Sequence, residues 1–244
     1  MPFRVTLTFA QPPHLFASRV PVWRRLLALA DAAATRLVTL WSSLVADARS
    51  TLRPGPLTQA LEAPNILEAH ALVSQTWHFA VEIPARRLLP VLATEVVEEA
   101  ARLMVPSVSR LVGQPVTFTT GLPETAQWVN QYAGTQIRDI SATTLKTVQH
   151  VLREGWNAGT GPRAMARRLR EVIGLTPRQQ QALEALRGRL EAQGQTAPQV
   201  RREVARATKR AVQYRAETIA TTESLTLSNH GAHTALVHAV RRGT

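Results

Sequence analysis

Apolar residues recur at intervals of three and four along most of this chain, and no other feature constrains the fold as strongly. Residues 21–52 carry one apolar row and a second row beside it. Such spacing places side chains on one side of an α-helix. We therefore expect one long amphipathic helix, whose wide apolar side packs on other helices, another subunit or a membrane surface. Asp31 and Arg36 interrupt the run, so it is not expected to span a membrane.

Proline and glycine mark where the later helices begin and end. Pro162 and Pro177 occupy positions suited to a first helical residue, and Gly174 suits a helix end. In the first half, helices are expected to end before Pro84 and at Pro106. Each predicted helix thus has a start or stop signal in its own sequence.

Two short stretches instead favour β-structure, namely the alternating residues 3–9 and the β-branched residues 116–120. They can pair with each other or extend as arms. The predicted fold class is mainly α, a multi-helix bundle-like assembly with one or two short strands at these positions. Three segments are expected: a strand with the long helix (1–56), a helical middle part (57–135) and a helical domain (136–240).

Glu223 occupies an unusual place within residues 211–237. It lies four residues after Ile219 and four before Leu227, so a helix places its carboxylate on the apolar side. A buried carboxylate needs a cation or several hydrogen-bond donors. The alternative is that Glu223 reaches solvent at the edge of that side. The candidate partners are Arg138, Arg167, Arg168 and Arg170.

The positive charge is concentrated in the second half of the chain. The net charge is +12; residues 1–137 carry 11 Lys or Arg against 9 Asp or Glu, and residues 138–244 carry 18 against 8. This asymmetry predicts an anionic partner, nucleic acid first and an acidic protein surface second. All cations except Lys146 and Lys209 are arginine, which suits phosphate or carboxylate; the alternative explanation of this bias is a GC-rich genome. The candidate contacts form a basic ridge of Arg201, Arg202, Arg206, Lys209 and Arg210.

Residues that could carry chemistry do not assemble into a catalytic or metal set. His230 and His233 have helical spacing, but neither a cysteine nor a nearby carboxylate completes a metal shell, so they are interpreted as surface or interface histidines. The glycines at 155, 159 and 161 lack the lysine of a phosphate loop and are interpreted as turn and cap residues. We expect no enzyme activity, cofactor, metal or small-molecule substrate. The absence of cysteine also favours an intracellular protein.

Several short motifs follow one another in a fixed order in the second half of the chain. They are Trp128; Ile137-Arg138-Asp139-Ile140-Ser141; the stretch from Gly155 to Gly161; the Ala166 to Gly174 helix with Leu175-Thr176-Pro177-Arg178-Gln179; and Arg215-Ala216-Glu217-Thr218-Ile219-Ala220-Thr221-Thr222-Glu223 with Asn229. In the order and spacing of these motifs, residues 118–236 resemble the phage head-morphogenesis family, the Mu F-like minor head proteins. One residue departs from the family pattern, because Thr221 stands where an arginine is usual.

The resemblance implies a virion protein that acts in capsid assembly. A member of this family is a low-copy component of the bacteriophage capsid interior, associated with the portal protein and other capsid components. It supports head assembly or DNA packaging, and some members are delivered with the genome. Contact with a membrane is not expected, and the host cytoplasm is the expected location during assembly. The alternative is a free Arg-rich accessory protein that binds genomic DNA.

Overall fold

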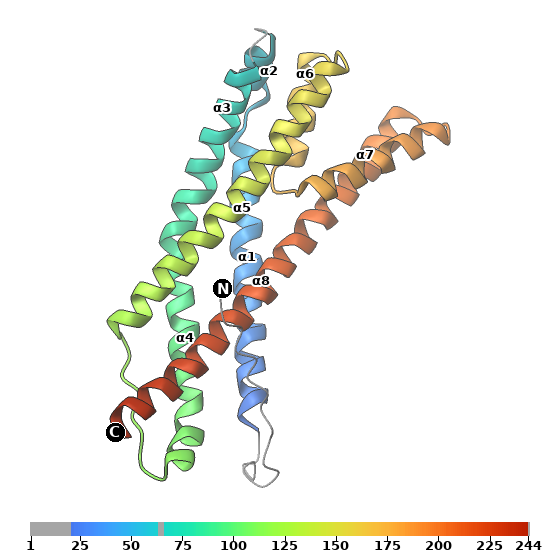
Figure 1. Cartoon of the computed structure of the whole chain (residues 1–244). Coiled ribbons are helices and arrows are strands. Elements are labelled where there is room, and N and C mark those ends of the chain that lie inside the picture. The colour runs from blue at the N-terminus through green and yellow to red at the C-terminus, as the bar shows by residue number, and fades with distance from the viewer. Residues whose placement is uncertain (1–20, 63–65, 244) are drawn as a thin grey trace, which may run out of the picture.

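The structure of the protein, a computed structural model, describes residues 21–62 and 66–243 as a set of long packed helices (Figure 1). In chain order these are α1 (Val22–Thr51), α2 (Pro54–Glu62), α3 (Ile66–Trp77), the π-helical turn η1 (His78–Glu82), α4 (Ile83–Val112), α5 (Pro123–Asn157), α6 (Pro162–Val172), α7 (Pro177–Ala192) and α8 (Ala197–Gly243). The predicted mainly α class is confirmed.

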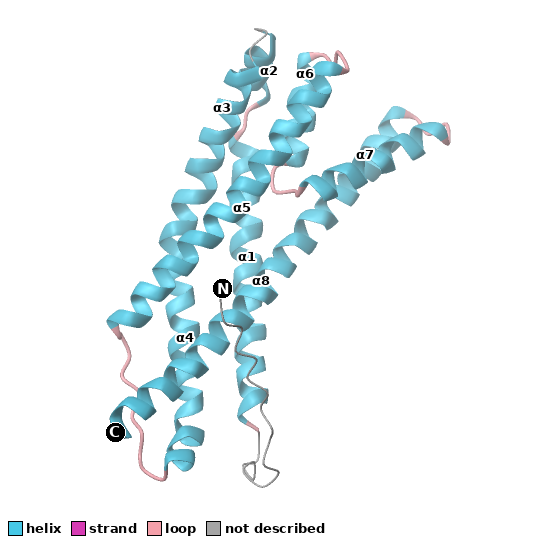
Figure 2. Cartoon of the chain, in the orientation of Figure 1, coloured by secondary structure: helices cyan, strands magenta, loops and turns pink. Residues whose placement is uncertain are grey.

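The strand expected at residues 116–120 is wrong, since no strand occurs in the described ranges (Figure 2). These residues belong to the connection between α4 and α5. The Val116 amide donates a hydrogen bond to Ser109 Oγ, and the Phe118 ring meets the His238 ring edge to face. Without a neighbouring strand the β-branched run has no ladder to join. The other expected strand, residues 3–9, lies outside the described part of the chain.

Helix α1 buries the row of apolar residues that its sequence period predicts. No glycine or proline interrupts its 30 residues, which span about 45 Å. Its buried side packs against α4 and α8, whereas Trp23 and Leu27 near its start remain 48% and 45% exposed. The buried residues are Ala30, Ala33, Leu37, Trp41, Leu44, Val45 and Ala48.

Helices α3 and α4 join through η1 into one rod, so the predicted stops before Pro84 and at Pro106 are wrong. At η1 the Ile83 amide bonds to the His78 carbonyl, five residues back, and Pro84 then stands in the first turn of α4. A proline lacks only the amide that a first turn leaves unpaired. Pro106 lies inside α4, which ends at Gly113 with φ of 71°. Packing of α4 against α1, α5 and α8 offsets the local cost of that proline.

Most of the residues predicted to start or end the later helices do so in the structure. Thr176 caps α7 with a capping box. Its hydroxyl accepts a hydrogen bond from the backbone N–H of Gln179, and the side-chain oxygen of Gln179 accepts one from the backbone N–H of Thr176. Pro162 follows the cap residue of α6, and Gly174 adopts φ of 83° beyond its end. Gly155 is the exception, since it is a buried residue of α5 and not part of the turn.

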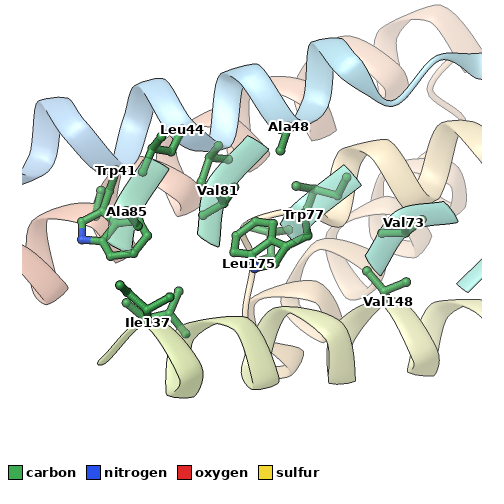
Figure 3. Close-up of a cluster of buried hydrophobic side chains, with 14 of the residues drawn as sticks. Trp41, Leu44, Ala48, Val73, Trp77, Val81, Ala85, Ile137, Val148 and Leu175 are labelled. Carbon is green, nitrogen blue, oxygen red and sulfur yellow. The ribbon is translucent and has the colours of Figure 1, made fainter. Parts of the chain in front are cut away.

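One hydrophobic core is shared by helices from all three expected segments. Trp41 of α1, Trp77 of α3 and Ile137 of α5 belong to the same buried cluster (Figure 3). The boundary expected after residue 135 falls inside α5, which runs unbroken from Pro123 to Asn157. The core therefore joins these segments, and α8 adds Ala216, Ala220 and Leu227 to it.

Helix α8 crosses the assembly obliquely and has two different environments (Figure 1). Its first part pairs with α7 and diverges from the other helices, whereas its later part lies against α1 and α4. At 47 residues it spans about 70 Å, long enough to reach from the projecting α7 to the far end of α4.

Candidate functional site

The carboxylate of Glu223 is buried between α8 and α5. Glu223 is 8% exposed, and one of its oxygens accepts a hydrogen bond from the phenol of Tyr132. Burial raises the pKa of this carboxyl, while the Tyr132 hydrogen bond acts in the opposite direction. Burial and the adjacent carboxylate also raise the pKa of Tyr132, so the phenol remains a donor. The pair joins the first third of α5 to the middle of α8.

The partner of Glu223 differs from the expected arginine. Within the described residues, none of Arg138, Arg167, Arg168 and Arg170 forms an ion pair with it: Arg138 donates to Thr135, Arg168 pairs with Glu184, and Arg170 reaches the Arg49 carbonyl. The physical reason is the helix order. Glu223 packs against the start of α5, whereas three of these arginines lie on α6, which contacts α2, α5 and α8 near the other end of α5.

Aromatic rings continue the contact between α5 and α8. Trp128 stacks on Tyr132 at a centroid distance of 4.8 Å and on His230 at 3.5 Å. Burial and the neighbouring His233 lower the pKa of His230, so the neutral ring is favoured in the folded protein. His230 is thus an intramolecular contact residue, while His233 is exposed. The described residues contain no cluster of three or more His, Asp or Glu side chains placed to hold a metal ion.

Arg215 provides a second, partly buried polar contact between α5 and α8. Its guanidinium donates to Thr144 Oγ1 at 3.1 Å and to the Ile140 carbonyl at 3.4 Å. Burial lowers the pKa of Arg215 to about 10, so the group remains charged at neutral pH. Both acceptors are uncharged, and within the described ranges no carboxylate pairs with this cation. The contact fixes the position of α8 along the axis of α5.

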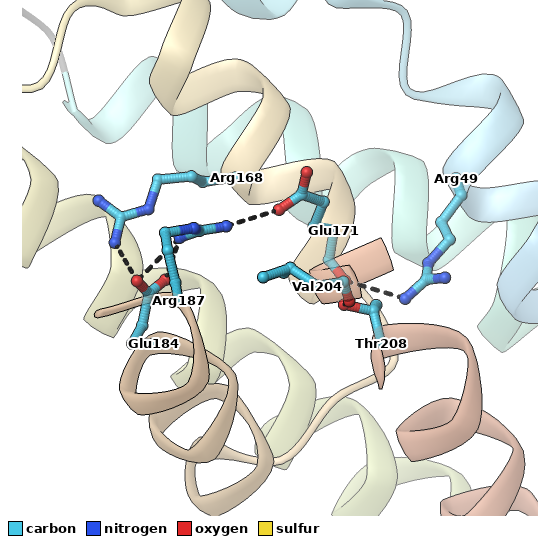
Figure 4. A network of polar contacts seen from close by, with 7 residues as sticks. All are labelled: Arg49, Arg168, Glu171, Glu184, Arg187, Val204 and Thr208. Atoms are coloured by element: carbon cyan, nitrogen blue, oxygen red, sulfur yellow. Dashed lines mark hydrogen bonds and ion pairs between the residues drawn. The ribbon is translucent and has the colours of Figure 1, made fainter. Parts of the chain in front are cut away.

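Two arginines cap the ends of α1 and α6 reciprocally. Arg49 Nη2 donates to the Glu171 and Ile173 carbonyls at 2.9 and 2.8 Å, and Arg170 donates to the Arg49 carbonyl at 3.3 to 3.4 Å. The last carbonyls of a helix lack intrahelical partners and carry partial negative charge. These bonds therefore hold the C-terminal ends of the two helices together, and Figure 4 shows the bond from Arg49 to Glu171.

An ion-pair network connects α6 to α7. Arg168 pairs with Glu184 at 2.7 Å, and Arg187 pairs with both Glu184 and Glu171, at 2.8 and 3.2 Å (Figure 4). Burial opposes ionisation of Glu184, but the charges of Arg168 and Arg187 outweigh it and lower the pKa of that carboxyl. Two cations and two carboxylates balance within this network, which leaves no net charge for a partner.

The basic ridge lies on the exposed part of α8. All five of its residues, Arg201, Arg202, Arg206, Lys209 and Arg210, are exposed. Among the described residues, Arg206 alone of these five forms an ion pair, with Glu203 at 2.8 Å. Val204 and Thr208 are buried between the ridge positions, so the helix has one side turned inward and its cations turned to solvent. The ridge therefore offers charge to an external partner.

Sequence reasoning missed Tyr132 and Arg215, although both had a signal. Tyr132 follows Trp128 by four residues and therefore shares its side of α5. Arg215 precedes Ile219 by four residues and Glu223 by eight, so it lies on the same row of α8 as the carboxylate. The spacing indicates that both side chains point toward a neighbouring helix, but it does not say which helix.

Comparisons of the chain with protein-family models, with curated proteins and with solved structures found no match. None of the helices in the described ranges is both long and apolar enough to cross a bilayer. A function for this chain is therefore inferred from its sequence and from the geometry of the described residues.

Proposed function

We propose that this protein is a bacteriophage minor head protein that acts inside the capsid near the portal and supports head assembly or DNA packaging. The observation that carries the proposal is the folding of residues 118–236, the segment that resembles the head-morphogenesis family. Its first and last helices are tied by the Tyr132–Glu223 and Arg215–Thr144 contacts, α6 packs against α5, and α7 projects with the start of α8.

These contacts favour an architectural role because the polar residues of the segment hold helices to each other. Glu223 and Arg215, both in the closing motif of the resemblance, are used within the fold. Exposed cations lie at other positions, among them Arg163 and Arg167 of α6 and the basic ridge on the first part of α8. A protein of this kind presents a rigid helical surface to other assembly components, and the basic ridge supplies the charge for that contact.

Co-expression with the portal and major capsid proteins of the same phage tests the proposal. Affinity capture through the portal protein should retain this chain, and assembled heads purified by sedimentation should contain it at low copy number. A variant in which Arg202, Lys209 and Arg210 are changed to glutamate should fold and lose that retention. Portal complexes and heads that assemble without the chain, with the free protein left in the supernatant, would refute the assignment.

The second candidate is a free accessory protein that binds DNA through the basic ridge. The exposure of its five cations favours this function, because exposed arginine and lysine neutralise phosphates and release counterions. DNA affinity that falls steeply with salt, measured with the isolated protein, would support the accessory protein if portal capture fails. Capture by the portal with weak, salt-independent DNA affinity would exclude it.

A further inference from the structure

A groove between α2 and α6 gathers arginines that the fold leaves unneutralised. It has a volume of about 820 Å³, and Arg163, Arg167 and Arg170 line it from α6. Thr58 and Gln59 line it from α2, together with the single carboxylate Glu62. This volume lies within the usual range for ligand-binding clefts, about 300 to 1,000 Å³. The groove is separate from the basic ridge, which lies on α8.

The two sides of α6 differ in how their arginines are satisfied. Toward α7, Arg168 shares the carboxylate of Glu184 with Arg187. Toward α2, neither Arg163 nor Arg167 forms an ion pair within the described ranges, and both are exposed. The arginines of α6 therefore have two different environments. Arg168 is neutralised by a carboxylate of α7, whereas Arg163 and Arg167 face the groove without an ion-pair partner in the described ranges.

The geometry of the row suits a repeating anion. Positions 163, 167 and 170 are four and three residues apart, so they lie on one side of α6 and span about 10 Å along its axis. One strand of a nucleic acid presents a phosphate about every 3.4 Å of helix axis, so the row spans about three intervals. Arg170 is also held in place, because it donates to the Arg49 carbonyl at 3.3 to 3.4 Å.

We propose that the groove between α2 and α6 binds the phosphate backbone of a nucleic acid, with Arg163 and Arg167 as the phosphate contacts and with Arg170, whose Nε and Nη2 bind the Arg49 carbonyl, as an additional positive charge. Planar guanidinium groups donate two hydrogen bonds to one phosphate, and the Thr58 hydroxyl and Gln59 amide supply uncharged donors from the facing wall. Glu62 opposes binding and limits the affinity. An acidic protein is a less suitable occupant, because its carboxylates are irregularly spaced while the arginine row is regular.

Fluorescence anisotropy with a short oligonucleotide, single-stranded in one arm and duplex in the other, tests the proposal. The double variant Arg163→Gln and Arg167→Gln should weaken binding and reduce the slope of log affinity against log salt by about 1.4 for the single strand or about 1.8 for the duplex. Between about 50 and about 200 mM salt, the loss of affinity for the single strand should then be about sevenfold smaller than in the wild type. Glu62→Gln should strengthen binding.

The matched control is Arg86→Gln with Arg87→Gln, which removes the same charge from exposed positions of α4. Circular dichroism must show that every variant melts as the wild type does. An equal loss of binding in the control pair would reduce the effect to net charge and overturn the groove as a site. Unchanged oligonucleotide binding in the double variant would also overturn the proposal. So would a double variant that loses binding of a polyglutamate peptide but keeps binding of the oligonucleotide. None of these results bears on capture by the portal, which is proposed to depend on the ridge.

Discussion

The two parts of α8 differ in charge and in burial, although they belong to one continuous helix. Residues 197–215 carry six Lys or Arg side chains, and the five of the basic ridge are exposed. Residues 216–239 carry none; this part lies against α1 and α4 with Ser224 and Ser228 buried, and it buries Glu223 against Tyr132 of α5. Helical period alone does not separate these parts, since both have an apolar row. The difference lies in what occupies the remaining positions, cations in one part and small or hydroxyl residues in the other.

The largest expected effect comes from placing a charge in the packed part of α8. Leu227 is 2% exposed, so Leu227→Asp buries a carboxylate without a partner and should cost about 3 to 5 kcal/mol of unfolding free energy. Leu225→Asp, two residues away at 38% exposure, is the control and should cost far less. Urea denaturation of both variants measures the difference. Equal stabilities would mean that the later part of α8 is not packed.

The next effect concerns Gly231, where α8 lies close to the backbone of α4. A Cβ at Gly231 would lie 2.2 Å from the Val97 carbonyl oxygen and 2.7 Å from the Ala100 Cβ. Gly231→Ala should therefore cost about 1 to 3 kcal/mol or more, because backbone must move. Gly155→Ala is the matched control, since its Cβ meets the end of the flexible Met165 side chain. The melting temperature of Gly231→Ala should be clearly lower than that of Gly155→Ala. The reverse order would show that α8 does not approach α4 closely at Gly231.

Removal of the buried carboxylate should have a smaller cost. Glu223→Ala leaves the Tyr132 phenol without its acceptor and should cost about 1 to 3 kcal/mol. Glu217→Ala removes an exposed side chain that accepts from Gln213 and should cost about 0.5 kcal/mol or less. Denaturant titrations of the two variants compare the two sides of α8 directly. Identical midpoints would show that Glu223 does not contribute to the contact with α5.

The pH dependence of stability separates Glu223 from His230. Burial raises the folded pKa of Glu223, so its contribution is greatest below its unfolded pKa of about 4.3 and is lost as pH rises through the folded value. Burial lowers the folded pKa of His230, so its contribution is lost as pH falls below about 6.5. Relative to the wild type, Glu223→Gln should gain stability toward higher pH and His230→Gln toward lower pH. Parallel pH profiles would contradict both assignments.

Much of the difference between the two parts of α8 could be predicted from the sequence. The predictions that failed concern contacts between helices that are distant in the chain. The spacing of Ile219, Glu223 and Leu227 indicated the side of α8 on which the carboxylate lies. It did not indicate that α5 would bring Tyr132 to it, because local spacing carries no information on which helix is adjacent. Pro84 and Pro106 signalled helix ends, but packing of α4 on three neighbours outweighs that local preference. The exposure of the basic ridge follows from its period, whereas the groove between α2 and α6 depends on tertiary structure alone.

The smallest expected effect on stability is also the most direct test of the division within α8. Reversal of Arg202, Lys209 and Arg210 to glutamate changes exposed residues that form no ion pair in the described part of the chain. The melting temperature should remain at the wild-type value, because surface changes away from packed contacts are usually worth about 0.5 kcal/mol or less. Capture by the portal protein, measured on the same sample, should be lost. A melting temperature lowered as in Leu227→Asp, or unchanged capture, would contradict the assignment of this part of α8 to an external partner.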